Sequence, residues 1–152
     1  MCFLTAIICV DNSLGFSFNN RRQSTDRTLN RYILETVKQA NASLTITNYS
    51  APLFSFCEDP SLLNIKHSDL LFDDEPITEF VFVENPQDFQ MIDWSSIDRL
   101  ILCFWNRNYP ADSYFCIPDG ISFKLDRQVT LKGSSHPEIT IEEYIPNSAK
   151  EL

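Results

Sequence analysis

The sequence is poor in glycine. Only Gly15, Gly120 and Gly133 occur among its 152 residues, and each is predicted to lie in a turn. A glycine-rich phosphate loop needs several glycines close together, because a side chain would occupy the space of the phosphate. The three isolated glycines therefore exclude a nucleotide site of the glycine-rich kind.

Basic residues are also scarce. The chain has 12 Lys and Arg against 21 Asp and Glu, which gives a formal net charge of -9. This charge repels phosphate backbones and anionic membrane surfaces, so we expect neither nucleic acid nor a membrane as a partner. No apolar run approaches the ~20 residues of a membrane span. One basic cluster could bind an anion, although a solvated loop and helix face is the favoured interpretation; it consists of Arg21, Arg22, Arg27 and Arg31.

Cysteine and histidine do not occur in metal-binding or disulfide patterns. The five cysteines are odd in number and have no Cys-x-x-Cys spacing, and Cys9 and Cys103 lie within apolar runs. Buried thiols in a reducing compartment explain this better than disulfides or zinc, so we expect a cytoplasmic protein. His67 and His136 have no neighbouring cysteine and are predicted to be exposed loop residues rather than metal ligands.

Apolar residues make up 43% of the chain and include twelve phenylalanines, which predicts one packed domain over residues 1–152. The apolar run at 3–10, closed by a turn at 11–15, is typical of a central strand covered on both faces. The polar segment 16–23 is predicted to be a surface loop. Ser24, Thr25 or Asp26 can cap the amphipathic helix that follows, whose apolar residues recur from Leu29 to Val37.

The rest of the chain alternates between clear and weak patterns. Residues 43–47 are predicted to form a strand parallel to the first, in a right-handed βαβ unit. In the poorly patterned segment 49–76, Leu62, Leu63 and Ile65 are assigned to a short helix and 73–76 to an acidic turn. Further strands are predicted at 80–83 and 100–105, with a helical turn from Pro86 between them. An antiparallel hairpin with one wet face, spanning 121–131 and 139–144, ends the fold.

Two sequence segments, and the order of the predicted elements around them, resemble the dihydrofolate reductase family. Residues 6–15, Ala-Ile-Ile-Cys-Val-Asp-Asn-Ser-Leu-Gly, are similar to its first strand and turn, and 99–102 with 109–115 are similar to its strand before Gly-Asp-Thr-x-Phe-Pro. The resemblance implies an α/β fold with a mixed, mostly parallel central sheet, flanking helices and a C-terminal antiparallel hairpin. It also implies that 49–76 is a shortened or remodelled version of the family's adenosine-binding region.

The substrate motifs of the family have been replaced. Its active-site Trp falls on Gln23, and its acidic residue falls on Thr28, which cannot hold an anionic charge. Asp26 restores a carboxylate in a slipped register, but its role as a helix cap is the favoured interpretation. If a ligand site survives, the resemblance places it at the backbone of Ala6 and at Arg21 and Arg22 in the loop that closes over the substrate.

The cofactor motifs have been replaced as well. The family's Gly-Arg-x-Thr becomes Thr-Asn-Tyr-Ser at 47–50, beginning with Thr47 and Asn48, and its Gly-Gly-Gly becomes Glu84, Asn85 and Pro86. Glutamate adds a negative charge where the phosphates would lie, and proline removes an N–H donor. No counterpart of the arginine that grips the folate tail is found. We therefore expect no cofactor and no metal.

These losses predict a degenerate, non-catalytic domain that acts through protein contacts or by binding an unknown small ligand. The alternative is a diverged NADPH-dependent reductase of a pterin-like or other small substrate, with Thr28 and Asp26 as its catalytic candidates. The apolar segment 53–72 is either ordinary core, the favoured interpretation, or a surface for self-association or another protein.

Overall fold

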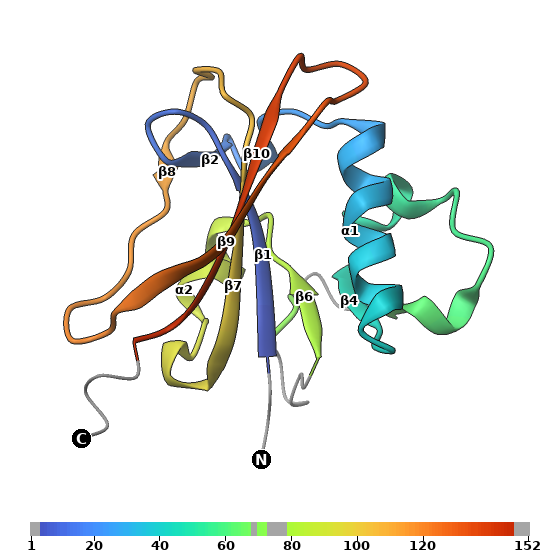
Figure 1. Cartoon of the computed structure of the whole chain (residues 1–152), viewed down its shortest axis with the longest axis horizontal. Coiled ribbons are helices and arrows are strands. Elements are labelled where there is room, and N and C mark those ends of the chain that lie inside the picture. The colour runs from blue at the N-terminus through green and yellow to red at the C-terminus, as the bar shows by residue number, and fades with distance from the viewer. Residues whose placement is uncertain (1–3, 68–69, 73–78, 148–152) are drawn as a thin grey trace.

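A seven-stranded mixed sheet forms the centre of the molecule (Figure 1). The computed structural model describes residues 4–67, 70–72 and 79–147. The sheet has the order β5-β4-β6-β1-β7-β10-β9, and its strands are β1 (Leu4–Val10), β4 (Leu44–Thr47), β5 (Leu63–Lys66), β6 (Phe80–Phe82), β7 (Ile97–Phe104), β9 (Phe123–Leu131) and β10 (Ile139–Pro146). The first five strands in this order, β5, β4, β6, β1 and β7, run parallel to one another. Strand β10 is antiparallel to both β7 and β9. This confirms the predicted α/β fold with its mixed sheet and C-terminal hairpin.

Strand β1 lies between β6 and β7 and has a packed core on each face. Ile7 faces the core that contains Leu29 and Ile33 of helix α1 (Arg27–Gln39). Ala6 and Ile8 face the opposite core, next to helix α2 (Pro86–Gln90). Figure 1 shows the two helices on opposite sides of the sheet. Burial on both faces explains why β1 is almost continuously apolar.

Strand β4 is parallel to β1, as predicted for the unit formed by β1, α1 and β4. Strand β4 belongs to the same parallel array as β1, with β6 inserted between them. Of the three predicted caps, Asp26 is the N-cap of α1, and its carboxylate accepts hydrogen bonds from the N–H groups of Thr28 and Leu29. The buried side of α1 repeats with helical spacing, as the apolar pattern predicts.

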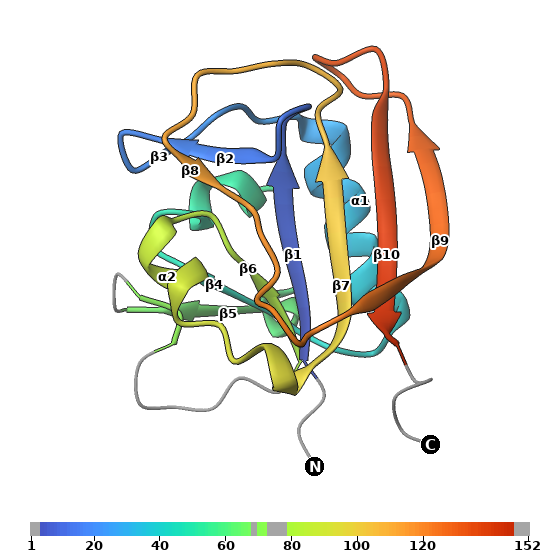
Figure 2. The ribbon, with the colours of Figure 1, turned by 90° about the vertical axis from the view of Figure 1, so that its left-hand side faces the viewer.

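Two segments differ from their predictions. The polar stretch 16–23 is largely strand, because β2 (Gly15–Phe18) pairs with β3 (Arg21–Arg22) and with the distant β8 (Ser113–Tyr114), as Figure 2 shows. The residues assigned to a short helix are instead the end of a 3₁₀ turn, η2 (Pro60–Leu62), and the edge strand β5. In both cases pairing with a partner remote in the chain overrides the local pattern. The acidic turn at 73–76 lies outside the described residues.

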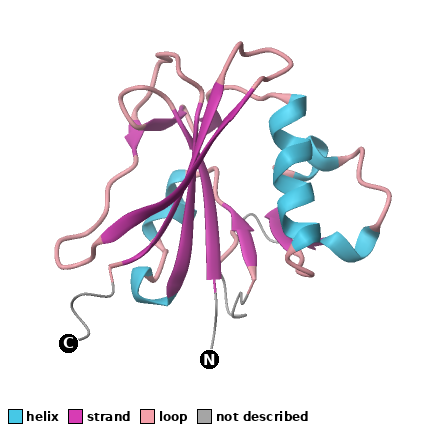
Figure 3. Cartoon of the chain, in the orientation of Figure 1, coloured by secondary structure: helices cyan, strands magenta, loops and turns pink. Residues whose placement is uncertain are grey.

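Two further 3₁₀ turns, η1 (Ala51–Phe54) and η3 (Trp94–Ser96), complete the architecture (Figure 3). Within the segment 53–72, Phe54 and Leu71 are buried, which confirms core as their role, whereas Phe56 and Ile65 are 37% and 40% exposed. None of the helices among the described residues is long and apolar enough to cross a membrane.

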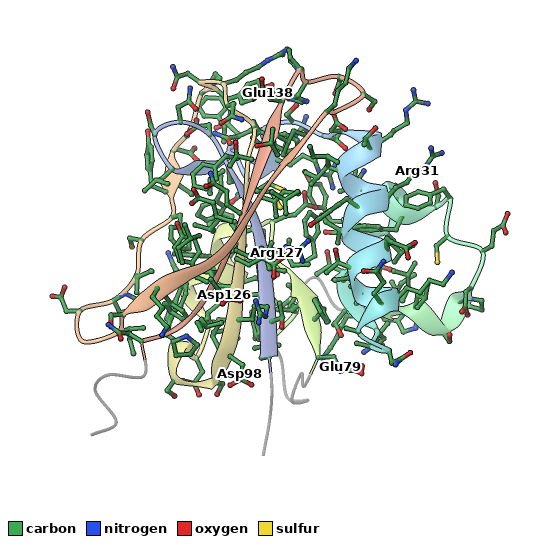
Figure 4. All side chains as sticks on the ribbon, viewed as in Figure 1. Arg31, Glu79, Asp98, Asp126, Arg127 and Glu138 are labelled. Atoms are coloured by element: carbon green, nitrogen blue, oxygen red, sulfur yellow. The ribbon has the colours of Figure 1, made fainter. Side chains whose placement is uncertain are left out.

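The hairpin of β9 and β10 has the predicted wet face. Ile139 and Ile141 are buried, while the middle of β9 is exposed. Asp126 and Arg127 lie on β9 (Figure 4). Arg99 of β7 forms ion pairs with Asp126 at 3.2 Å and with Glu143 of β10 at 3.0 Å. These charges join β7, β9 and β10 across the hairpin.

Candidate functional site

A small inner cavity lies where the carboxyl ends of β1 and β6 meet the N-terminal end of α1. Its lining includes Cys9 of β1, Val83 after β6, Trp105 after β7, and Ser24 and Asn30 at the start of α1. The cavity is small: the centre of a water molecule can occupy a volume of only about 10 Å³ in it. This is about the space of one water molecule.

Arg22 and Glu84, which both belong to the lining of this cavity, form an ion pair. Arg22 Nε donates to Glu84 Oε2 at 2.8 Å, and Arg22 Nη2 donates to Glu84 Oε1 at 2.9 Å, a two-point contact typical of strong guanidinium–carboxylate pairs. Ser50 Oγ also donates to Glu84, at 2.7 Å. The guanidinium lies 4.2 Å from the centre of the Tyr49 ring. Burial alone lowers the pKa of Arg22, but the hydrogen bonds and charge of Glu84 outweigh it and raise the pKa above its ordinary value.

The partners of Arg22 come from the two segments where the sequence was expected to carry cofactor motifs. Tyr49, whose carbonyl accepts from Arg22 Nη2 at 3.1 Å, follows β4, and Glu84 follows β6. Ser50, the next residue after Tyr49, contacts Glu84 rather than Arg22. Of the other residues in those segments, Thr47 is buried and Asn48 donates to the carbonyl of His67 at 3.4 Å. Asn85 is the N-cap of α2, and Pro86 is its first residue. The replaced motifs therefore hold Arg22 in place and begin a short helix.

Of the other residues at the family's substrate positions, Gln23 lines the inner cavity, whereas Ala6, Thr28 and Asp26 do not. Ala6 is fully buried between β6 and β7, and Thr28 is half-buried in the first turn of α1. Gln23, at the expected Trp position, lines the cavity and donates from Nε2 to Asp11 Oδ2 at 2.9 Å.

Asp26 is 1% exposed and joins α1 to the turn between β9 and β10. Besides capping the helix, it accepts hydrogen bonds from the N–H groups of Ser134 at 3.0 Å, Ser135 at 2.8 Å and His136 at 3.2 Å. Desolvation raises the pKa of Asp26, but the backbone donors of Ser135, Ser134 and Leu29 outweigh it, so the pKa is lowered well below its ordinary value. Asp26 is therefore a fixed anion, in line with the favoured interpretation of a cap.

His136 is 2% exposed, so the prediction of an exposed loop histidine is wrong. The turn that carries it folds onto the start of α1, where His136 Nδ1 lies 3.2 Å from Asp26 Oδ2. On its other side, His136 Nε2 lies 2.9 Å from the hydroxyl of Tyr109 and 3.2 Å from Ser24 Oγ, and its ring stacks on Trp105 with centres 4.7 Å apart. No local pattern signals a contact between residues 110 positions apart.

A wider outer groove lies between the β2–β3 hairpin and the segment after β7. It has a volume of about 520 Å³ and is lined by Phe18, Asn19, Arg21, Arg22, Gln23, Tyr109 and Pro110. Arg22 and Gln23 form the boundary between this groove and the inner cavity. Arg21 is exposed, and within the described ranges its guanidinium has no hydrogen-bond or ion-pair partner. Of the two predicted arginines, Arg22 is thus paired and Arg21 is available.

The described part of the chain holds no group of three or more His, Cys, Asp or Glu side chains placed to bind a metal ion. No protein-family model matches the sequence. No curated protein matches it either.

Many solved structures match the fold. One is dihydrofolate reductase from Enterococcus faecalis, determined as a complex with NADP(H) and RAB-propyl. Its TM-score is 0.59 at 12% sequence identity, and the match covers 95% of this chain and 96% of that one. This likeness shows the dihydrofolate reductase fold, as the sequence resemblance predicts, and nothing about activity.

Proposed function

We propose that this chain, which has the fold of dihydrofolate reductases, is a degenerate domain without reductase activity that acts by binding a small ligand or a protein partner. The observation that carries the proposal is the Arg22–Glu84 pair in the lining of the small inner cavity. Hydride transfer requires a nicotinamide ring and a substrate ring side by side, and pockets for such molecules have volumes of roughly 300–1,000 Å³. The inner cavity has room for about one water molecule.

Proton chemistry supports the same proposal. A reductase of this fold needs a group that supplies a proton near the substrate, and Thr28 has no ionisable side chain. Asp26 is anionic, buried and occupied by donors from α1 and from the β9–β10 turn. A carboxylate with such a lowered pKa stays ionised near neutral pH, so it does not serve as the acid.

An NADPH titration tests the proposal. Trp105 lines the inner cavity, so its fluorescence reports binding there, whereas Trp94 packs against the core on the other face of the sheet. We expect neither quenching nor a rise in melting temperature at millimolar NADPH or folate, with an active dihydrofolate reductase as the positive control. Saturable quenching with a higher melting temperature would contradict the proposal and favour the diverged NADPH-dependent reductase, because a ligand that binds the native state stabilises it.

A further inference from the structure

Three side chains between the start of α1 and the β9–β10 turn are arranged as a nucleophile, a base and an orienting carboxylate. Ser24 Oγ lies 3.2 Å from His136 Nε2, and His136 Nδ1 lies 3.2 Å from Asp26 Oδ2. The turn and the start of the helix lie at the same end of the molecule (Figure 1). A hydroxyl, an imidazole and a carboxylate in this order are recognised by their geometry, and they occur on unrelated folds in enzymes that transfer acyl groups. Capping of α1 by Asp26 requires no imidazole, so the cap alone does not explain the arrangement.

Asp26 holds the imidazole in the orientation that a general base requires. Its side chain is buried and anionic. An anion beside Nδ1 favours the neutral tautomer with its proton on Nδ1, which leaves the lone pair of Nε2 facing Ser24. Ser135 Oγ also lies 3.1 Å from Nδ1, but its own proton has acceptors in the Thr25 carbonyl and in Asp26. The Trp105 ring stacks on the imidazole with centres 4.7 Å apart and restricts its rotation.

Tyr109 places a second hydroxyl next to the nucleophile. Its oxygen lies 2.9 Å from His136 Nε2 and 3.4 Å from Ser24 Oγ. Because Nε2 has a single lone pair, it accepts the proton of only one of the two hydroxyls at a time. When Nε2 takes the proton of Ser24, the Tyr109 O–H is released and can donate to an oxygen beside Ser24 Oγ. A donor in this place stabilises the negative charge that develops on an ester carbonyl oxygen under attack.

The space beside Ser24 limits the substrate to a small molecule. Ser24 is half-buried and lines the inner cavity, which has room for about one water molecule. A neighbouring hollow of about 230 Å³ shares Thr25, Asn30 and Leu53 with that lining and adds the ring of Phe56. Pockets for drug-sized ligands begin at roughly 300 Å³, so this hollow suits a short ester with a small apolar body.

We propose that this cluster hydrolyses small carboxylic esters, with Ser24 as the nucleophile and His136 as the general base. Tyr109 donates to the carbonyl oxygen in the transition state. Asp26 is a positioning residue, because it acts through the imidazole. The proposal adds a reaction without a cofactor to a domain that lacks reductase activity in the proposed function, and it does not rest on that function.

The reaction has two steps that use the same groups. In the first, Ser24 Oγ bonds to the carbonyl carbon as its proton passes to His136 Nε2; the bond to the leaving oxygen then breaks, and that oxygen takes the proton from Nε2 and departs as an alcohol. In the second, a water oxygen bonds to the acyl carbon as a water proton passes to Nε2. The bond to Ser24 Oγ breaks and the oxygen recovers the proton, which releases a carboxylic acid.

Phenylmethylsulfonyl fluoride and p-nitrophenyl acetate are the probes for the whole chain. The fluoride should sulfonylate Ser24 with loss of hydrogen fluoride, which peptide mass spectrometry locates, and the acetate should release p-nitrophenol with turnover. Ser24→Ala should abolish this label and lower the turnover about a hundredfold. Ser96→Ala is the matched control, because Ser96 is also half-buried but its hydroxyl donates to Asp93 Oδ2 at 2.9 Å. It should keep the wild-type label and rate.

The roles of Tyr109 and Asp26 are tested separately. Tyr109→Phe should lower the turnover about tenfold, because a donor to the carbonyl oxygen is lost. A higher turnover would show that the phenol only competes for Nε2 and would overturn its role. Nitrogen-15 NMR, at a pH high enough to deprotonate the imidazole, should find the His136 proton on Nδ1, and Asp26→Asn should weaken this preference.

Three results would each overturn the proposal: no sulfonyl label on Ser24 of the wild type, turnover that Ser24→Ala leaves unchanged, or a His136 proton on Nε2. The label on the wild type needs no variant, so this test does not depend on how a variant folds. The NADPH titration gives a separate result. Because ester hydrolysis needs no cofactor, NADPH binding would contradict the proposed function without altering the outcome with the ester.

Discussion

Arg22 and Arg21 are neighbours in the chain but have different roles. Glu84 is 9% exposed at its side chain, so removing Arg22 leaves a nearly buried carboxylate with only the Ser50 hydroxyl. We expect Arg22→Met to lower the free energy of unfolding by about 2 kcal/mol, because an uncompensated buried charge is costly. Arg21→Met, which removes an exposed and unpaired arginine, should change it by less than about 0.5 kcal/mol. Urea denaturation measures both, and equal effects would contradict the assignment of Arg22 to the Glu84 contact.

Asp26 makes the stability depend on pH. Its folded pKa is lowered, so its contribution is present above the unfolded value of about 4 and is lost as the pH falls through the folded value. Asp26→Asn should cost about 2 kcal/mol near neutral pH, because the amide cannot accept from all of the donors that the carboxylate satisfies.

Urea denaturation over a pH series measures this difference, which should shrink as the pH falls below about 4. Asp59→Asn is the control, since Asp59 caps the 3₁₀ turn η2 on the open surface and contacts only Ser61 through its carboxylate. We expect a small effect there. A cost of Asp26→Asn that stayed constant into the acid range would show that the charge is not what stabilises the cap.

At the scale of elements, the β9–β10 turn docks on the start of α1 through Gly133. A Cβ atom at this position would lie 2.5 Å from Asp26 Oδ2 and 2.7 Å from the carbonyl oxygen of His136. Gly133→Ala should therefore push the turn away from the helix and lower the free energy of unfolding by about 3 kcal/mol, at the upper end for overpacking.

Gly120 provides the comparison for this prediction. It has a φ of +86° with no heavy atom within 4 Å of an added Cβ, so Gly120→Ala meets only backbone strain of about 1 kcal/mol. Thermal and urea unfolding should rank Gly133→Ala as clearly more destabilising. The reverse order would show that the turn does not rely on close approach to Asp26.

For the whole molecule, the outermost strands of the sheet among the described residues are β5 and β9. Phe56 and Ile65, from the segment predicted to form an interface, are exposed near the β5 side, and we expect weak, concentration-dependent self-association through them. Sedimentation equilibrium should show a dimer that dissociates in Phe56→Ser/Ile65→Lys. Leu125→Ser on β9, which removes an apolar side chain that is 50% exposed, should leave association unchanged. A monomer at all concentrations would exclude self-association and leave a different protein as the partner.

Much of the fold could be predicted because its signals are local. The apolar run of β1, the helical spacing from Leu29 to Val37 and the alternation of β10 each follow from backbone periodicity and burial. Strand β2 and strand β5 could not be predicted in the same way, because their pairing partners lie elsewhere in the chain. These strands are short, and their local sequence pattern is more typical of a loop or a helix than of a strand.

For the candidate site, composition and local motifs are enough to predict which chemistry is missing. The scarcity of glycine and the presence of Glu84 and Pro86 follow from composition and local motif spacing, which need no coordinates. The residues that occupy the place of that chemistry become evident in three dimensions, where Arg22 contacts Glu84 across 62 positions and Asp26 contacts His136 across 110. Such contacts depend on which strands and turns lie side by side in the folded chain. A local sequence pattern does not show which distant residues these are.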